Sequence, residues 1–282
     1  MSVNEKIISV LKENGIYSFG FIPFSDCSPV NKRLYDECAE RGMKSVIIFA
    51  IPYKTAQKPK DSYKMSAYAR VYDYHKKFSL IFDSLLCELK STFPEYGFLS
   101  YADNSPVNEK TAAALSGIGV IGRNTLLITE KYGSYVFLGS VITDMETEST
   151  RTALSVCIGC GRCAAACPNN AIGEKSFDFE KCLSYISQKN VKTDEEAELL
   201  KKHGTVWGCD ICQQVCPMNE DVSLTDDGYF TDSFIYELSY AFIEAMNDAD
   251  FHKYPFSWRK KQTILYNISL INSYNDNKKD DS

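Results

Sequence analysis

The stretch CIGCGRCAAACP, residues 157–168, decides how this chain is organised. Its four cysteines, Cys157, Cys160, Cys163 and Cys167, follow the spacing C-x2-C-x2-C-x3-C-P. This is the bacterial ferredoxin pattern, in which three thiolates from one tight loop bind one 4Fe-4S cluster and the fourth binds a neighbouring cluster. The stretch therefore predicts a domain that holds two clusters.

A second run, CDICQQVCP at residues 209–217, has the spacing C-x2-C-x3-C-P. It lacks one cysteine of the full pattern, and Cys182, alone between the two runs, brings the total to eight. When the last cysteine of each run binds the other cluster, the two runs exchange ligands. The first predicted ligand set is then Cys157, Cys160, Cys163 and Cys216, and the second is Cys167, Cys182, Cys209 and Cys212.

Two tetrahedral zinc sites are the alternative for these eight thiolates, because cysteine spacing alone also suits zinc. The three other cysteines, Cys27, Cys38 and Cys87, are scattered through the first half of the chain. A lone cysteine in a reducing compartment is usually a small buried apolar residue. No function is assigned to these three.

The composition is typical of a soluble, cytoplasmic protein. A chain of 282 residues buries a large core without disulfides. Its N-terminus, MSVNEKIISVLKENG, has the pattern of an amphipathic helix rather than of a signal peptide, and no apolar run is long enough to cross a membrane. The net charge of −6 argues against a general nucleic-acid binder.

One segment departs from this acidic balance. Residues 54–77 carry seven basic side chains against two acidic ones. We expect such a stretch to be able to meet phosphates. An ordinary solvated helix face and loop is the alternative.

Alternating helical and strand patterns predict an α/β domain over residues 1–150. The helices are expected at residues 3–13, 31–42, 66–92 and 107–115, and the strands at 17–22, 45–51 and 98–102. A hairpin of residues 125–129 and 135–143 is expected to follow them.

The rest of the chain is predicted to form two further parts. Residues 151–220 hold the cysteines and are predicted to be a ferredoxin-like double-cluster domain. Residues 221–282 are predicted to be a short helical C-terminus, with helices near 231–246 and 258–272 and a disordered tail, NDNKKDDS.

The segment GIGVIG, residues 117–122, matches the G-x-G-x-x-G fingerprint of dinucleotide-binding proteins. That fingerprint must follow a strand and open a helix. Here it follows a helical pattern and leads into a predicted strand, NTLLIT. We therefore expect no nicotinamide site at these glycines.

The order of motifs along the chain resembles the epoxyqueuosine reductase family. The resemblance covers about residues 1–220 and rests on SAYARVYDYHK (66–76), YADNSPVNE (101–109), GIGVIGRNTLLIT (117–129) and KYGSYVFLGSVITD (131–144), followed by the cysteine runs with CLSYISQK between them. It implies an oxidoreductase that removes the epoxide oxygen of epoxyqueuosine in tRNA and so completes queuosine. It also implies cobalamin bound in the α/β domain, two 4Fe-4S clusters, a small electron-donor protein such as ferredoxin or flavodoxin, and a monomer.

The chain also departs from the family's pattern. The family's usual chain continues into helical repeats, whereas only a helix pair is expected here, so the resemblance is to a short form. CPMN replaces the usual C-P-W-N, and Ser140 stands where a glutamate is common. The redox motifs match the family better than the substrate motifs do.

Matching the motifs residue by residue implies that Asp103 is the proton donor. Removing an epoxide oxygen as water requires a group that protonates it. A carboxyl group donates a proton near neutral pH only if its surroundings, here an apolar site and the corrin face, raise its pKa. The alternative is that Asp103 merely caps the following helix.

The same matching implies contacts to cobalamin. The residues are Tyr68, Arg123, Asn124, Leu127, Ser134, Leu138 and Asp210. Ordinary turn and hairpin contacts are the alternative for the polar ones. Two other functions stay open: the same cofactors acting on another substrate, by reductive dehalogenation or corrinoid activation, and a ferredoxin-like electron carrier.

Overall fold

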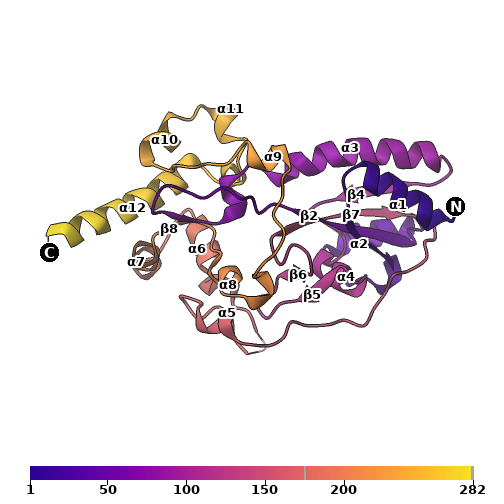
Figure 1. Ribbon diagram of the computed structural model, residues 1–282, viewed down its shortest axis with the longest axis horizontal. Helices are drawn as coiled ribbons and strands as arrows, with labels where there is room; N and C mark the ends of the chain where they lie inside the picture. The colour runs from indigo at the N-terminus through magenta and orange to yellow at the C-terminus, as the bar shows by residue number, and fades with distance from the viewer. Residues whose placement is uncertain (175, 281–282) are drawn as a thin grey trace. The chain divides into compact units, whose positions relative to one another are not determined.

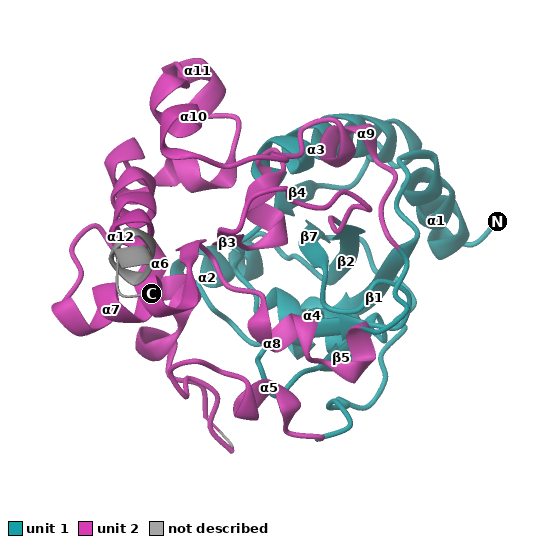
Figure 2. Ribbon diagram, turned by 60° about the vertical axis from the view of Figure 1, so that its left-hand side comes forward, with its two compact units in different colours: residues 1–52, 74–159, 220–223 teal, residues 53–73, 160–219, 224–282 magenta. Residues whose placement is uncertain are grey.

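The structure of the protein is a computed structural model that describes residues 1–174 and 176–280. The described chain forms two compact units (Figure 2). Unit 1 contains residues 1–52, 74–159 and 220–223, and unit 2 contains residues 53–73, 160–219 and 224–282. These units differ from the predicted division at 150 and 220, because residues 53–73 belong with the cysteine-rich segment.

A pairing of two short strands explains this difference. The strand β3 (Lys64–Met65) lies parallel to β8 (Thr205–Trp207), with Lys64 opposite Thr205. The backbone N–H of Ser66 also donates to the carbonyl of Trp207. Residues 53–73 therefore complete a sheet of unit 2, although they precede the cysteines by many residues.

Unit 1 is built on a four-stranded antiparallel sheet in the order β1-β2-β7-β4. The strands are β1 (Ser18–Pro23), β2 (Ser45–Pro52), β7 (Val136–Thr143) and β4 (Phe98–Tyr101). Almost every residue of β2 is buried, which fits its continuous apolar sequence SVIIFAIP. The predicted α/β class and the predicted strands β1, β2 and β4 are confirmed.

Helices cover both faces of this sheet (Figure 1). On one face, the ring of Phe49 in β2 lies 5.9 Å from Phe78 and 6.1 Å from Phe82, both on α3 (Tyr74–Thr92). The helix α1 (Val3–Glu13) packs beside α3. On the other face, Ile48 belongs to a core shared with α2 (Lys32–Glu40) and α4 (Glu109–Leu115). The alternation of side chains along β2 thus supplies two separate cores.

Gly139 in β7 lies where this packing leaves no room for a side chain. A Cβ atom there would be 2.2 Å from Cε1 of Phe78 and 3.0 Å from Cζ of Phe49. We expect Gly139→Ala to lower the free energy of unfolding by about 1–3 kcal/mol, because rings in a dense core must shift. Urea denaturation would measure this loss. Gly97→Ala, whose Cβ would lie 3.6 Å from its nearest neighbour, is the control, and equal stability of the two variants would contradict the prediction.

Two predicted elements of unit 1 are wrong. The predicted helix 66–92 begins only at Tyr74, because the N–H groups of Ser66 and Ala67 donate to Trp207 and Asp210. Residues 67–70 form the short 3-10 turn η2 (Ala67–Arg70) instead. The predicted hairpin does not form. Instead β6 (Leu127–Thr129) pairs with β5 (Gly119–Ile121), and β7 inserts between β2 and β4, where its apolar residues are buried. The GIGVIG segment thus includes a strand rather than opening a helix.

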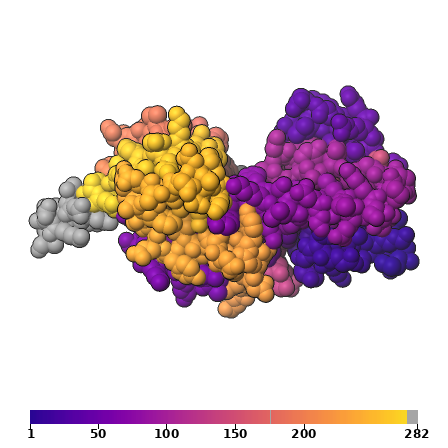
Figure 3. Space-filling model, turned by 90° about the horizontal axis from the view of Figure 1, so that it is seen from above, coloured from indigo at the N-terminus to yellow at the C-terminus, as the bar shows by residue number. Residues whose placement is uncertain are grey.

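Unit 2 is mostly helical. Its core surrounds Trp207 of β8 and includes Phe256 and Ile264. Ile243 of α10, Phe251 of α11 and Ile264 of α12 belong to this core, and this part of the chain forms the orange and yellow surface in Figure 3. Its helices are α5 (Arg162–Ala165), α6 (Leu183–Gln188), α7 (Asp194–His203), α8 (Ile211–Gln214), α9 (Gly228–Thr231), α10 (Tyr240–Ala245), α11 (Asp248–Phe251) and α12 (Lys261–Asp280).

The C-terminal segment differs from the prediction in two ways. The helix expected at 231–246 is divided, since α10 starts only at Tyr240, whose N-cap Ser239 accepts a hydrogen bond from the N–H of Phe242. The helix expected at 258–272 continues to Asp280 as α12. It thereby includes residues 275–280 of the predicted disordered tail, while residues 281 and 282 lie outside the described residues. The remaining short 3-10 turns are η1 (Phe24–Asp26), η3 (Phe179–Lys181), η4 (Pro217–Asn219) and η5 (Pro255–Trp258).

A buried ion pair anchors residues 53–73 within unit 2. The guanidinium of Arg70 makes two hydrogen bonds of 2.9 Å to the carboxylate of Asp61, and their side chains are only 2% and 6% exposed. The N–H groups of Tyr63 and Leu238 also donate to Asp61. Arg70 is therefore not available to phosphates, which removes one charge from the basic stretch predicted to meet them.

Asp61→Asn is expected to lower the stability of unit 2 by about 3–5 kcal/mol, because it leaves the buried Arg70 without its counterion. Burial opposes the charged form of Asp61, but the hydrogen bonds from Arg70 outweigh it and lower the pKa of this carboxyl. The stabilisation is therefore present at neutral pH and is lost as pH falls below the ordinary aspartate range towards the folded-state pKa. Urea midpoints at pH 7 and pH 3 test this. Glu198→Gln, an exposed partner of Lys201, is the control and should change little. A loss at pH 7 no larger than that of the control would contradict the prediction.

Within the described residues, no helix has both the length and the apolar composition that a membrane span requires.

Candidate functional site

Unit 1 contains a cavity of about 480 Å³ that opens beside the end of β4. Apolar side chains form much of its wall, and a few polar groups converge on it. This combination is typical of sites for small molecules and cofactors. The residues that line it are Val30, Tyr74, Asp103, Val107, Asn108, Glu109, Lys110, Leu126, Leu127, Ser134, Val136, Phe137 and Leu138.

Asp103 lies in the loop after β4, at a backbone φ of 66°. Aspartate tolerates this left-handed conformation better than most residues. The Tyr74 hydroxyl donates a hydrogen bond to Oδ2 of Asp103, and Nε2 of His75 lies 3.1 Å from the same oxygen. The ring of Tyr74 stacks on Phe137 at 4.1 Å. Two residues at the start of α3 thus hold the carboxylate in one orientation.

These partners determine how Asp103 titrates. Burial by itself would raise the pKa of Asp103, but hydrogen bonds from His75 and Tyr74 outweigh it and hold the pKa below its ordinary value. The chain's own residues thus lower the pKa of Asp103, whereas the sequence analysis expected an apolar site and the corrin face to raise it. The physical reason is that two donors stabilise the ionised form.

The alternative role of Asp103 as a helix cap does not hold. The helix α4 begins at Glu109, and its N-cap is Asn108. The side-chain oxygen of Asn108 accepts a hydrogen bond of 3.1 Å from the N–H of Thr111. Asp103 is thus left to face the cavity.

Glu109 is a second carboxyl group in the cavity. Burial first, and then the nearby charge of Asp103, raise the pKa of Glu109 to about 8. The hydroxyl of Ser140 lies 3.4 Å from Oε1 of Glu109 as a donor, and the N–H of Asp103 also donates to this carboxyl. The pKa values of the two neighbouring carboxyl groups are therefore shifted in opposite directions, down for Asp103 and up for Glu109. Such a pair contains one group that keeps its proton and one that is ionised.

The sequence reasoning did not select Tyr74, His75 or Glu109. All three lie inside the motifs quoted for the resemblance, DYHK and SPVNE. No spacing rule indicates that the start of α3 and the start of α4 face the same cavity, because that depends on how both helices pack on the sheet.

The structure separates the residues predicted to contact cobalamin into three groups. Leu127, Ser134 and Leu138 line the cavity with Asp103. Arg123 and Asn124 lie in the turn between β5 and β6 and are not among the residues that line the cavity. Asn124 is buried, and its side-chain oxygen accepts a hydrogen bond from the N–H of Leu126. The remaining two, Tyr68 and Asp210, belong to unit 2.

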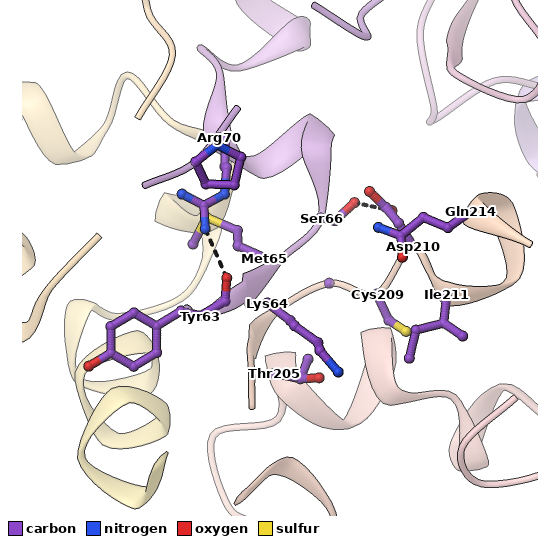
Figure 4. Close-up of a pocket in the computed structure, with 12 residues that line it drawn as sticks. Tyr63, Lys64, Met65, Ser66, Arg70, Thr205, Cys209, Asp210, Ile211 and Gln214 are labelled. Atoms are coloured by element: carbon purple, nitrogen blue, oxygen red, sulfur yellow. Dashed lines mark hydrogen bonds between the residues drawn. The ribbon is translucent and has the colours of Figure 1, made fainter. Parts of the chain in front are cut away.

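Asp210 joins two segments of unit 2 beside Cys209. Its buried carboxylate accepts hydrogen bonds from the Ser66 hydroxyl at 2.5 Å, the Ala67 N–H at 2.7 Å and the Gln213 side chain at 2.9 Å. Figure 4 shows Ser66 and Asp210 pointing towards each other at the wall of a pocket of about 250 Å³, which Cys209 also lines. Burial raises the pKa of Asp210, although these hydrogen bonds oppose the rise.

Tyr68 lies against the same loop. A Cβ atom on Gly208 would be 3.2 Å from Cε1 of Tyr68 and 2.6 Å from Cβ of Ser66. Gly208 has a φ of 66°, so the loop passes directly under the Tyr68 ring just before Cys209. The absence of a side chain permits this close approach.

The cysteines of unit 2 lie at the ends of short helices. Cys163 is on α5, Cys182 is the N-cap residue of α6, and Cys212 is on α8. Cys167 and Cys216 follow α5 and α8, and Cys160 lies between two glycines with positive φ. All eleven cysteines lie within the described residues, and none is in a disulfide.

Three cysteines of the second predicted ligand set influence one another electrostatically. Burial raises the pKa of Cys209 to about 11, and the charges of Cys182 and Cys167 contribute to the rise. Cys167 likewise contributes to the raised pKa of Cys182, after burial. Cysteines that affect one another's titration are near neighbours, as ligands of one cluster must be. Within the described residues, no group of three or more His, Cys, Asp or Glu side chains is placed to hold a single metal ion. The assignment of these thiols to one 4Fe-4S cluster therefore rests on the spacing of the cysteines.

The scattered cysteines differ in exposure. Cys27 and Cys38 are buried apolar residues of the unit 1 core, as predicted. Cys87 on α3 is exposed instead.

Comparison with protein families identifies two segments of the chain. A family model described as "4Fe-4S double cluster binding domain" matches residues 156–219. This match decides between clusters and zinc in favour of clusters. A second model, described as "Epoxyqueuosine reductase QueG, DUF1730", matches residues 33–104.

Solved structures with a similar fold include epoxyqueuosine reductases. The one from Streptococcus thermophilus has a TM-score of 0.82 at 24% identity, over 97% of this chain and 82% of that one. A crystal structure of an epoxyqueuosine reductase with an epoxyqueuosine-modified tRNA-Tyr stem loop has a TM-score of 0.79 at 23% identity, over 96% and 81% of the two chains. These likenesses confirm the fold.

Curated relatives extend the similarity to sequence. The epoxyqueuosine reductase of Gloeobacter violaceus is 39% identical over 182 residues, which are 63% of this chain and 57% of that protein. The epoxyqueuosine reductase of Listeria monocytogenes is 34% identical over 203 residues, which are 67% and 52% of the two chains. The match thus spans little more than half the length of these relatives. Together with the two family models, these relatives show that the chain belongs to the epoxyqueuosine reductase family.

Proposed function

We propose that the protein is a cobalamin- and iron–sulfur-dependent reductase that converts epoxyqueuosine to queuosine in tRNA. The relatives of 30–39% identity carry the name of this activity, and a structure of the same fold binds a tRNA stem loop that carries epoxyqueuosine. The proposal places the protein in the cytoplasm, where tRNA is modified.

The chain's residues fit the cofactors that this reaction needs. Leu127, Ser134 and Leu138 would contact cobalamin at the apolar wall of the unit 1 cavity, and Arg123, Asn124, Tyr68 and Asp210 are proposed to contact it as well. The two cysteine sets, Cys157, Cys160, Cys163 and Cys216, and Cys167, Cys182, Cys209 and Cys212, would hold the clusters of the matched domain. When bound, these groups supply the two electrons that the reduction consumes.

The protein's own residues handle the proton. Converting an epoxide to an alkene consumes two electrons and two protons and releases water, so the leaving oxygen must be protonated at the site. Asp103 faces the cavity, and Tyr74 and His75 fix its position. We infer that Asp103 delivers a proton to that oxygen.

The partners are proposed with the function. The tRNA substrate is proposed from the name of the curated relatives, and the stem-loop complex of a protein with a similar fold supports it. A small ferredoxin or flavodoxin would supply the electrons, since nothing in the reaction regenerates them. The protein is proposed to act as a monomer.

Reductive dehalogenation is favoured less than epoxide reduction. A reductive dehalogenase described by its structure as B12-dependent shares the fold with a TM-score of 0.50, at 16% identity and over 36% of that chain. The epoxyqueuosine reductases match at higher identity and over a larger share of their own length.

The observation that carries the proposal is the orientation of Asp103 in an apolar cavity by Tyr74 and His75, in a chain with these relatives. The test is to incubate protein reconstituted with iron, sulfide and cobalamin with a reductant and an anticodon stem loop carrying epoxyqueuosine. Nucleoside mass analysis should show queuosine. A loop that already carries queuosine is the control.

The outcomes separate the alternatives. Loss of the epoxide oxygen supports the proposal. Protein that binds both cofactors but leaves epoxyqueuosine unchanged would contradict the substrate. Protein that binds iron and no cobalamin would indicate an electron carrier instead.

A further inference from the structure

Two carboxyl groups share the cavity of unit 1, and their surroundings differ. Asp103 is 58% exposed and has two donors on its side-chain oxygen, Tyr74 and His75. Glu109 is less exposed, and its donors are the neutral hydroxyl of Ser140 and the N–H of Asp103. The second contact brings the Glu109 carboxyl to the backbone of the very residue that is inferred to deliver the proton.

The charged and titratable groups around this pair come from three elements. Tyr74 and His75 belong to α3 and lie on the Asp103 side. Lys110 follows Glu109 on α4 and lines the cavity, and burial lowers the pKa of its ammonium group. The strand β7 contributes Ser140 and no charge. Among the described residues, the groups that lower the pKa of Glu109 are the backbone of Asp103 and the hydroxyl of Ser140, and neither is cationic.

We propose that Glu109 holds the proton that Asp103 passes to the leaving oxygen of the substrate, and this role rests on the proposed function. Asp103 is the ionised, well-oriented member of the pair, and Glu109 is the neutral member at physiological pH. Glu109 thus acts through Asp103 as a proton reservoir.

The transfer conserves charge. The O–H bond of Glu109 breaks as the O–H bond of Asp103 forms, so the pair carries one negative charge before and after. Delivery from Asp103 to the oxygen then leaves both groups ionised, and one proton from solvent restores Glu109. The two electrons of the reduction come from the donor protein of the proposed function, and the second proton comes from solvent.

The first test observes the protonation directly, without turnover. Protein labelled with 13C in glutamate carboxyl groups is titrated by NMR, with Glu109→Gln used to assign the signal. We expect Glu109 to titrate near pH 8 in the wild-type chain and at a lower pH in Asp103→Asn, because that change removes the neighbouring charge. A Glu109 signal that titrates at the ordinary glutamate pH would overturn the proposal.

The second test uses the pH profile of turnover on the stem loop. Because Glu109 must be protonated, wild-type turnover should fall as pH rises through about 8. Glu109→Gln should reduce turnover by at least about tenfold and remove that fall, since glutamine keeps the shape but holds no transferable proton. Glu95→Gln, at an exposed position of unit 1, is the matched control and should behave as wild type.

A further variant, Ser140→Ala, tests the role of Glu109 even if Glu109→Gln fails to fold. Ser140→Ala keeps the Glu109 carboxyl group but removes a hydrogen-bond donor that lowers the pKa of Glu109. The fall in turnover with rising pH should therefore move to higher pH. An unmoved limb in Ser140→Ala, or unchanged turnover in Glu109→Gln, would overturn the role of Glu109. A wild-type protein with both cofactors and no turnover would instead overturn the proposed function, and the NMR titration would still decide which carboxyl holds the proton.

Discussion

Asp103→Asn is expected to reduce conversion of epoxyqueuosine by about 10²–10⁴-fold, the usual contribution of a positioned acid or base. Asparagine retains the size of the side chain and an oxygen that accepts from the Tyr74 hydroxyl. It neither accepts a proton from Glu109 nor releases one to the substrate. The loss should therefore appear in turnover, while iron and cobalamin contents stay at wild-type values. Single-turnover assays with metal and corrinoid analysis of the same samples would measure both.

The control for this variant is Asp36→Asn on α2, an exposed carboxylate that pairs with Lys32 at 2.9 Å. An exposed pair of this kind contributes little to stability, so this variant should keep full activity. Turnover in Asp103→Asn within a few-fold of the control would exclude Asp103 from proton delivery.

Cys182→Ser is expected to remove one cluster and with it all turnover. Two 4Fe-4S clusters contain about eight irons, and a serine hydroxyl is a poor substitute for a thiolate ligand, so iron should fall by about four per chain. The effect is large because Cys182 has no neighbouring cysteine within its own segment to replace it. Iron analysis and electron paramagnetic resonance of the reduced protein would measure the loss.

Cys87→Ser is the matched control, since Cys87 is exposed on α3 and lies outside both cysteine runs. Its iron content should equal that of wild type. If Cys182→Ser also retained all its iron, Cys182 would not be a ligand, and the ligand sets would have to be assigned again.

The sequence predicted those features that depend on local pattern. The apolar run SVIIFAIP is buried on both faces as β2, and the capping box from Ser2 to Glu5 opens the predicted first helix. The cysteine spacing predicted a double-cluster domain because the spacing is itself the geometry of the ligands.

Features that depend on distant pairing were not predictable in this way. The strand β7 has the turn signals of a hairpin with β6, yet it pairs with β2 and β4, where more of its apolar surface is buried. The pKa of Asp103 was expected to rise, but the donors that lower it come from α3. The pKa of Glu109 is raised first by its burial in the cavity and then by the charge of Asp103, six residues earlier in the chain, and no periodicity describes the loop that brings the two residues together.

The pairing of β3 with β8 has a consequence for how the protein is made. Residues 53–73 leave the ribosome well before the strand that completes their sheet, and at ordinary synthesis rates the delay is on the order of ten seconds. During that interval Arg70 and Asp61 are both available to form their ion pair. Their other partners, the N–H of Leu238 and the carbonyl of Ile235, have not yet been synthesised. Unit 2 therefore reaches its final form only after its C-terminal helices, which share the core around Trp207, have been synthesised.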